Sequence, residues 1–244
     1  MCQRAKQADR DWSRRVLLPI TQAAKQIWFS FKECLFLIRN RTRDGRFATI
    51  YHDDLWGNPE SASGYGSTAD ATATTRAGLE SLIQQYGVAT LLDAPCGDFN
   101  WMRQVRFDGT YIGCDIVPKL VARNENVYGN ARRSFCRLDI CEDQLPKSDL
   151  VLCRECLNHL SFAEISSALF NLERATKVLL VITHYPAITQ NRDQVASFRF
   201  RPLNLTLPPF SLRAPDSLID EGSFETGKTL GVWDFRRGSL ASPS

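Results

Sequence analysis

Three acidic side chains each end a short apolar run, and their spacing suits the recognition of a nucleoside. Asp93, Asp115 and Asp139 close three successive runs of this kind. One acid at the end of a strand is often only a turn cap. An acid about 20 residues beyond the first strand, however, is the device by which α/β sheets hold ribose hydroxyls, and Asp115 follows Asp93 by 22 residues. The three acids together predict a ligand site at the C-terminal edge of a sheet.

The turn after the first run narrows the choice of ligand. It reads Asp93-Ala-Pro-Cys-Gly97-Asp98, and its glycine allows the backbone to approach a ligand closely. A dinucleotide site needs a G-x-G-x-x-G turn for the pyrophosphate, whereas this chain has Pro95 and Phe99 near its single glycine. The sequence therefore disfavours an NAD(P)-dependent oxidoreductase. It favours a ligand with one carboxylate, a ribose and an adenine.

The elements that position these residues alternate along the chain. Apolar runs predict strands over 88–93, 110–115, 134–139, 149–153 and 177–183, and helical patterns lie over 68–86, 101–105, 119–128 and 161–176. Strands that alternate with helices indicate a mostly parallel sheet covered on both faces. Two more runs, 203–207 and 229–235, lack a helix between them and predict an antiparallel closing pair. We expect an α/β fold with an open, doubly wound, seven-stranded sheet and an N-terminal helical arm.

The charge is divided unevenly between two expected parts, an arm over 1–45 and a domain over 46–244. Residues 1–44 hold ten basic and four acidic side chains, a balance of +6, whereas the remaining 200 residues carry 20 basic and 23 acidic ones, a balance of −3. The basic excess thus belongs to the arm, and the domain is not predicted to bind nucleic acid. Residues 20–38 have the spacing of a basic amphipathic helix, so residues 14–43 could contact a membrane surface or a protein. Packing on its own domain is the simpler alternative.

The eight cysteines have irregular spacing, and several lie inside apolar runs. This pattern favours buried free thiols over a disulfide framework. Cys153 and Cys156 form a CxxC, but no second pair follows to complete a metal site, and none is expected. No secretory signal is convincing, because Pro19 interrupts the apolar run after the charged start. We therefore expect a cytoplasmic protein.

Several of these stretches resemble the motifs of class I S-adenosylmethionine-dependent methyltransferases. The run 91–97 (Leu-Leu-Asp-Ala-Pro-Cys-Gly) is similar to their first motif, with Pro95 in place of the usual first glycine. The runs 111–116 and 136–140 are similar to the second and third motifs, and residues 149–161 to the fourth strand and its loop. The resemblance covers roughly residues 70–183 and implies this fold, with S-adenosylmethionine as the cofactor.

Three further stretches resemble a little-characterised bacterial-type branch of that family. They are Ser-Ala-Ser-Gly-Tyr-Gly-Ser at 61–67, Cys-Gly-Asp-Phe-Asn-Trp-Met at 96–102 and Arg-Pro-Leu-Asn-Leu at 201–205. This narrower resemblance implies a fold and a cofactor but no substrate. The loop 61–67, with Tyr65 and the nearby Trp56, could fold over the cofactor as a lid, since these aromatic residues could cover a sulfonium; a plain linker is the alternative.

The resemblance also implies a role for individual residues. Asp93 and Gly97 would border the methionine part of the cofactor, Asp115 would hold the ribose hydroxyls, and Asp139 with its neighbour would meet the adenine. The full set of expected cofactor-binding residues is Asp93, Ala94, Cys96, Gly97, Trp101, Asp115, Ile116, Asp139 and Ile140.

Residues that follow the fourth and fifth expected strands are the candidates for binding the molecule that accepts the methyl group. His159, Arg154 and His184 are the catalytic candidates, and His159 could act as a base on a hydroxyl, thiol or amine. A capping or packing role is the alternative for each histidine. The expected function is a methyltransferase for a small-molecule acceptor. A binding or scaffold protein that has kept the fold without catalysis stays open as the second interpretation.

Overall fold

The computed structural model describes residues 34–194, 199–222 and 227–241. The chain divides after Arg41, and the second unit, Thr42–Ser244, contains the whole sheet. Of the helix expected over 20–38, residues 20–33 lie outside the described residues, and residues 34–39 are helical. The arm over 1–45 and its contact with a membrane or protein therefore stay predictions. In the described part of the chain, no helix is both long and apolar enough to cross a bilayer.

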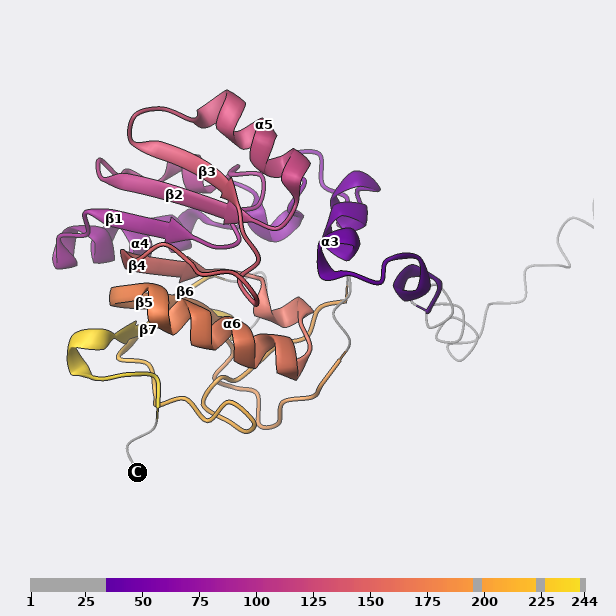
Figure 1. Cartoon of the computed structure of the whole chain (residues 1–244). Helices are drawn as coiled ribbons and strands as arrows, with labels where there is room; N and C mark the ends of the chain where they lie inside the picture. Colours follow the sequence, from indigo (N-terminus) through magenta and orange to yellow (C-terminus); the bar gives the residue numbers. More distant parts are fainter. Residues whose placement is uncertain (1–33, 195–198, 223–226, 242–244) are drawn as a thin grey trace, which may run out of the picture. The chain divides into compact units, whose positions relative to one another are not determined.

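Helices and strands alternate along the second unit, as Figure 1 shows. The strands are β1 (Thr90–Asp93), β2 (Thr110–Asp115), β3 (Arg133–Arg137), β4 (Ser148–Cys153), β5 (Thr176–His184), β6 (Ser217–Asp220) and β7 (Thr229–Asp234). The α-helices are α3 (Arg43–His52), α4 (Ala73–Tyr86), α5 (Pro118–Tyr128) and α6 (Phe162–Ala175). Short 3₁₀ turns are η1 (Tyr65–Ser67), η2 (Met102–Gln104), η3 (Leu157–His159) and η4 (Phe235–Arg237).

The seven strands form one sheet in the order β3-β2-β1-β4-β5-β7-β6. Neighbours from β3 to β5 pair in parallel, whereas β7 runs antiparallel to both β5 and β6. The expected open, mostly parallel sheet with an antiparallel closing strand is therefore confirmed. The strand order reverses between β1 and β4, and a ligand in such a sheet binds outside the carboxyl ends of the strands at this point.

Each face of the sheet is covered by its own apolar cluster, because side chains alternate along a buried strand. Leu91 belongs to the cluster that contains α4 and α5 residues, and Leu92 belongs to the one that contains α6 residues. Both leucines have no exposed surface. Helix α6 begins at the expected capping box, in which Ser161 and Glu164 bond to each other's backbone N–H groups. Figure 1 shows α6 in orange across one face.

The structure corrects three expected elements. Residues 203–207 are not a strand, and the strand that pairs with β7 is β6 instead. The segment is held by single backbone hydrogen bonds and by side chains instead of a strand ladder. Asn191 Oδ1 accepts a hydrogen bond from the Asn204 amide at 2.9 Å, and His184 Nδ1 accepts one from the Leu205 amide at 3.2 Å. The helix expected over 101–105 is only the turn η2. The third strand ends at Arg137, two residues before its expected acid.

Candidate functional site

A cavity of about 350 Å³ opens at the carboxyl ends of β1, β2 and β4. This volume lies within the range of about 300–1,000 Å³ that small-molecule sites occupy. Ten of the residues expected at a site line it: Asp93, Cys96, Gly97, Trp101, Asp115, Ile116, Asp139, Ile140, Arg154 and His159. Ala94 and His184 are the two expected residues that do not line it. The structure thus brings the three strand-end acids to one cavity.

The turn at Gly97 forms one wall of this cavity and requires its glycine. Gly97 has a φ of +54°, and a Cβ atom there would collide with the Ser63 hydroxyl. Its amide donates to Asp115 Oδ2 at 3.1 Å, and its carbonyl accepts from Asn124 Nδ2 at 2.8 Å. The turn is therefore fixed from both sides, against β2 and against α5.

Asp115 is held ready to accept further hydrogen bonds. Its Oδ1 accepts from the Val117 amide at 3.0 Å, and its Oδ2 accepts from the Gly97 amide. Each carboxylate oxygen has two lone pairs, so each can take one more donor, such as one hydroxyl of a ribose. Burial raises the pKa of Asp115 to about 6, although the backbone N–H groups lower it. The carboxyl is 7% exposed and mostly ionised at neutral pH.

Asp93 lies at the end of β1 and is more completely enclosed. Tyr111 donates its phenolic proton to Asp93 Oδ2 at 2.7 Å. Burial raises the pKa of Asp93 to about 7, against the lowering effects of the Tyr111 hydrogen bond and the Arg154 charge. A cation that enters the cavity would favour the ionised form of this carboxyl.

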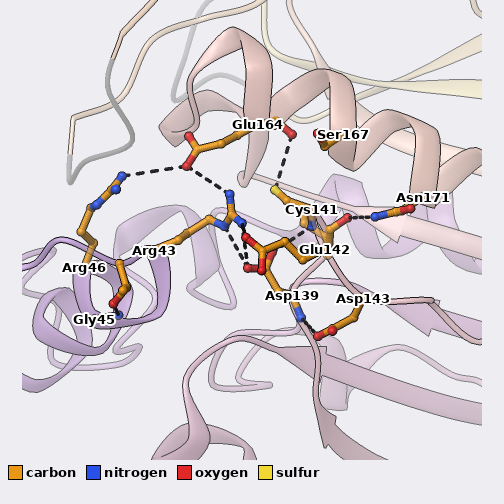
Figure 2. Close-up of polar contacts among 12 residues, drawn as sticks. Arg43, Gly45, Arg46, Asp139, Cys141, Glu142, Asp143, Glu164, Ser167 and Asn171 are labelled. Carbon is orange, nitrogen blue, oxygen red and sulfur yellow. Dashed lines mark hydrogen bonds and ion pairs between the residues drawn. The ribbon is translucent and has the colours of Figure 1, made fainter.

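Asp139 is bound by an arginine that the sequence analysis left in the basic arm (Figure 2). Arg43, the first residue of α3, donates from Nε to Asp139 Oδ2 at 3.0 Å. The same guanidinium contacts Glu142 at 2.7 Å and Glu164 at 3.1 Å. The other oxygen, Oδ1, accepts from the Cys141 amide at 2.9 Å. Arg43 thus fixes the orientation of Asp139 and ties α3 to the cavity that it lines.

The loop 61–67 lies directly against the Gly97 turn and lines the cavity from Ala62 onward. Asp98 accepts from the Ala62 amide at 2.9 Å, and the Asp98 amide donates to Ser63 Oγ at 3.1 Å. At the other end of the loop, Arg154 Nη2 donates to the Gly66 carbonyl at 2.8 Å. The loop is therefore a tethered wall of the site rather than a plain linker.

Arg154 occupies a buried ion-pair network behind this loop. Its side chain is 4% exposed and donates to Glu221 Oε1 at 2.5 Å. Lys228 Nζ lies 3.4 Å from Glu155 and 3.8 Å from Glu221. These contacts show Arg154 as a structural connector between the loop 61–67 and the segment before β7. Its guanidinium is held by the protein, which does not favour the expected catalytic role.

The two histidine candidates separate in the structure. His184 lies away from the cavity, since its Nδ1 accepts from the Leu205 amide and its ring packs edge-on against Trp233 at 6.1 Å. The expected catalytic role of His184 therefore has no support, and its contacts are those of the structural alternative. His159 lines the cavity beside Trp56 and Phe200.

Trp56, which was expected near the cofactor with the loop 61–67, lines the cavity. Sequence reasoning missed Phe200 and Lys228, which also line it, because each comes from a segment with no motif around it. Asp98 and Arg43 were also missed, although Asp98 stands beside Gly97 in the motif.

The cysteines that the structure describes are free thiols. Cys96, Cys114, Cys141, Cys153 and Cys156 are buried free thiols, in agreement with the expectation from their spacing. Among the described residues, no cluster of histidine, cysteine and acidic side chains could hold a metal ion.

Neither a protein-family model nor a curated protein matches the sequence. Solved structures do match the fold. The N-methyltransferase NodS from Bradyrhizobium japonicum WM9, in complex with S-adenosyl-L-homocysteine, superposes with a TM-score of 0.56 at 14% identity, over 76% of this chain and 98% of that one. The chain has the class I methyltransferase fold.

Two other structures with the class I methyltransferase fold support this assignment. Magnesium protoporphyrin IX methyltransferase from Synechocystis PCC 6803, with bound S-adenosylmethionine, gives a TM-score of 0.54 at 15% identity, over 82% of this chain and 96% of that one. PigF with S-adenosylhomocysteine gives 0.50 at 16% identity, over 67% of this chain; the match spans only 55% of PigF. At these identities the likeness concerns the fold.

Proposed function

We propose that the chain is an S-adenosylmethionine-dependent methyltransferase that acts on a small-molecule acceptor. The observation that carries the proposal is the convergence of Asp93, Asp115 and Asp139 on one cavity beside the Gly97 turn. In support, the three solved structures above are described with S-adenosylmethionine or its demethylated product bound.

The residues present fit this cofactor by their chemistry. Asp115 has a free lone pair on each oxygen for a pair of ribose hydroxyls. Asp93 and Asp115 supply negative charge for the cationic sulfonium and ammonium groups. Ile116, Leu138 and Ile140 give apolar walls on which an adenine ring can lie. S-adenosylmethionine carries a carboxylate and no pyrophosphate. It therefore does not require the glycine pattern of a pyrophosphate site, which this chain lacks after its first strand.

In the bound state, the cofactor supplies a methyl group on a sulfonium whose leaving group is a neutral thioether. The protein's part is to hold the acceptor in line with that group and to exclude water, since orientation alone can remove about 7–11 kcal/mol of a barrier. The tethered loop 61–67 and helix α3 both line the cavity. They enclose the site, which strengthens the electrostatic effect of each buried carboxylate.

Calorimetric titration tests the cofactor directly. S-adenosylmethionine and S-adenosylhomocysteine are expected to bind in the micromolar range, about −8 kcal/mol, and NAD is expected not to bind. Transfer of a radiolabelled methyl group to small molecules from a lysate then tests the activity, with Asp115→Ala as the binding-defective control. NAD binding without S-adenosylmethionine binding would overturn the proposal. Cofactor binding with no labelled product would favour the non-catalytic alternative.

A further inference from the structure

Part of the cavity lining is built from aromatic rings. The Trp56 ring lies 5.2 Å from the His159 ring, and the Phe200 ring lies edge-on to His159 at 6.2 Å. Tyr185 packs edge-on against Phe200 at 6.0 Å and supports it from behind. Trp56, His159 and Phe200 line the cavity, and we call these three residues the aromatic wall. These distances between ring centroids are those of favourable aromatic contacts. The flat ring of a ligand could therefore pack against the aromatic wall.

His159 places one hydrogen-bond acceptor in this wall. Its Nδ1 lies 2.8 Å from the Arg199 carbonyl oxygen. A carbonyl only accepts, so Nδ1 carries the proton and Nε2 has the lone pair. Among the residues that the structure describes, no protein group bonds to Nε2. The tautomer is therefore fixed by the backbone, and the basic nitrogen is available to a molecule in the cavity.

The surroundings of His159 keep this imidazole neutral. Burial lowers the pKa of His159 to about 4, the Arg199 carbonyl opposes that shift, and the charge of Arg201 adds to it. The Arg201 guanidinium is fixed nearby by hydrogen bonds to the carbonyls of Asn158 and Leu160, at 3.1 Å and 2.6 Å. A neutral imidazole beside an arginine disfavours a cationic amine and favours an uncharged molecule with a proton to donate.

We propose that the acceptor is a hydroxyarene, a flat aromatic ring with a phenolic hydroxyl, which stacks on the aromatic wall and donates its proton to His159 Nε2. This inference rests on the proposed function. As the oxygen lone pair forms its bond to the methyl carbon, the carbon–sulfur bond breaks with its electron pair on sulfur. The phenolic proton, held in its hydrogen bond to Nε2, is released to water as the methyl group is transferred, because the surroundings of His159 disfavour a lasting imidazolium. The products are an aryl methyl ether, S-adenosylhomocysteine and one proton.

Binding without the cofactor tests the wall and the nitrogen separately. The probes are 4-nitrophenol, used at a pH below its own pKa so that it can donate a proton, and 4-nitroanisole, which cannot; both are followed by absorbance. Trp56→Leu is expected to weaken both ligands about fivefold, because it removes a ring contact. His159→Phe keeps an aromatic ring but removes Nε2, so it should weaken 4-nitrophenol about tenfold and leave 4-nitroanisole unchanged. His52→Gln, at an exposed histidine, is the control and should change neither.

Methyl transfer tests the proton step. His159→Phe is expected to lower kcat for a phenol about 100-fold or more at pH 7. It should lower kcat less than about threefold for an aryl thiol that is already ionised at that pH, because a thiolate has no proton to lose. Equal losses for the two acceptors would indicate a structural role and overturn the inference.

The outcomes also separate this inference from the proposed function. A chain that binds 4-nitrophenol through His159 but does not bind S-adenosylmethionine overturns the proposed function. A chain that binds the cofactor but neither arene overturns the hydroxyarene assignment and leaves the proposed function standing.

Discussion

The two sides of the cavity are built in different ways. The acidic side comes from the ends of β1 and β2 and the turns that follow them, and the sheet fixes its geometry. The aromatic wall comes from loops around Trp56 and Phe200 and from the turn η3. Rigid strand ends suit a ligand that stays the same, whereas loops can change their side chains without disturbing the sheet. The comparison teaches that cofactor binding and acceptor binding should respond to different substitutions.

The largest effect is expected at Asp115. Replacement by alanine removes two hydrogen bonds of a charged group to the proposed cofactor, each worth about 1.5–3 kcal/mol. The affinity for S-adenosylmethionine should fall at least about 100-fold in calorimetry. Asp70→Asn, at an exposed acid outside the cavity lining, is the control and should bind normally. Unchanged affinity in Asp115→Ala would contradict the assignment of cofactor binding to the acidic side of the cavity.

The Gly97 turn can be tested by the free energy of unfolding. Gly97→Ala adds a left-handed backbone penalty and a collision with Ser63 Oγ, so about 2–3 kcal/mol should be lost in urea unfolding. Gly87→Ala is the matched comparison, since Gly87 has a φ of +61° but open space around its Cβ position. It should lose only about 1 kcal/mol. Equal losses would mean that the loop 61–67 moves away at no cost.

Arg43 tests whether helix α3 belongs to the acidic side. Arg43→Ala leaves Asp139 without the guanidinium 2.9 Å away, so that only the Cys141 amide still orients its carboxylate. We expect the affinity for S-adenosylmethionine to fall about tenfold, with little change in the binding of 4-nitroanisole. Arg46→Ala, on the same helix and 3.9 Å from Glu164, serves as the control. An equal loss in both variants would point to a general effect of the helix.

The pH dependence of cofactor affinity follows from Asp115. Its pKa of about 6 lies above the ordinary value because of burial, so the carboxyl gains a proton between pH 7 and pH 5. Affinity for S-adenosylmethionine should weaken at least about tenfold over this range, because Asp93, whose pKa burial raises to about 7, gains a proton over the same range. In Asp115→Asn only the part due to Asp93 should remain. The free energy of unfolding depends on pH in the opposite direction. The raised pKa of Asp115 favours the folded chain at low pH, and this contribution is lost as the pH rises through about 6.

The smallest effect is expected on the aromatic wall. Phe200→Leu keeps an apolar side chain but removes one ring contact, so KM for a hydroxyarene should rise about threefold to fivefold. The affinity for S-adenosylmethionine should not change. Phe170→Leu, at a residue of α6 that is 59% exposed, is the control. A comparable loss of cofactor affinity in Phe200→Leu would show that the two sides are not independent.

The acidic side could be anticipated from the sequence, because its signals are local. A buried parallel strand leaves a continuous apolar run, and an acid at the end of that run marks the edge of the sheet. Asp93 and Asp115 end their strands as expected, and Asp139 lies two residues past its strand. The positions of the first five strands along the chain and the capping box of α6 were also accessible in this way.

The other parts of the fold and of the site could not be predicted, because they depend on contacts between residues that are far apart in the sequence. Arg43 meets Asp139 across 96 residues of sequence. Residues 203–207 are apolar because they are buried as a loop, whose backbone is satisfied by Asn191 and His184. Strand β6 has an exposed pattern and only four residues, so it leaves no apolar run. The aromatic wall is assembled from segments with no common spacing.

The contacts of Arg154 also set when the cavity is completed during synthesis. Its carboxylate partner, Glu221, comes 67 residues later in the chain, and the Gly66 carbonyl precedes it by 88 residues. A nascent chain can pair β1 to β5 before Glu221 leaves the ribosome, but a buried arginine without its carboxylate is costly. The back of the site is therefore sealed only after the segment around Glu221 has been synthesised, and ligand binding is acquired after that point.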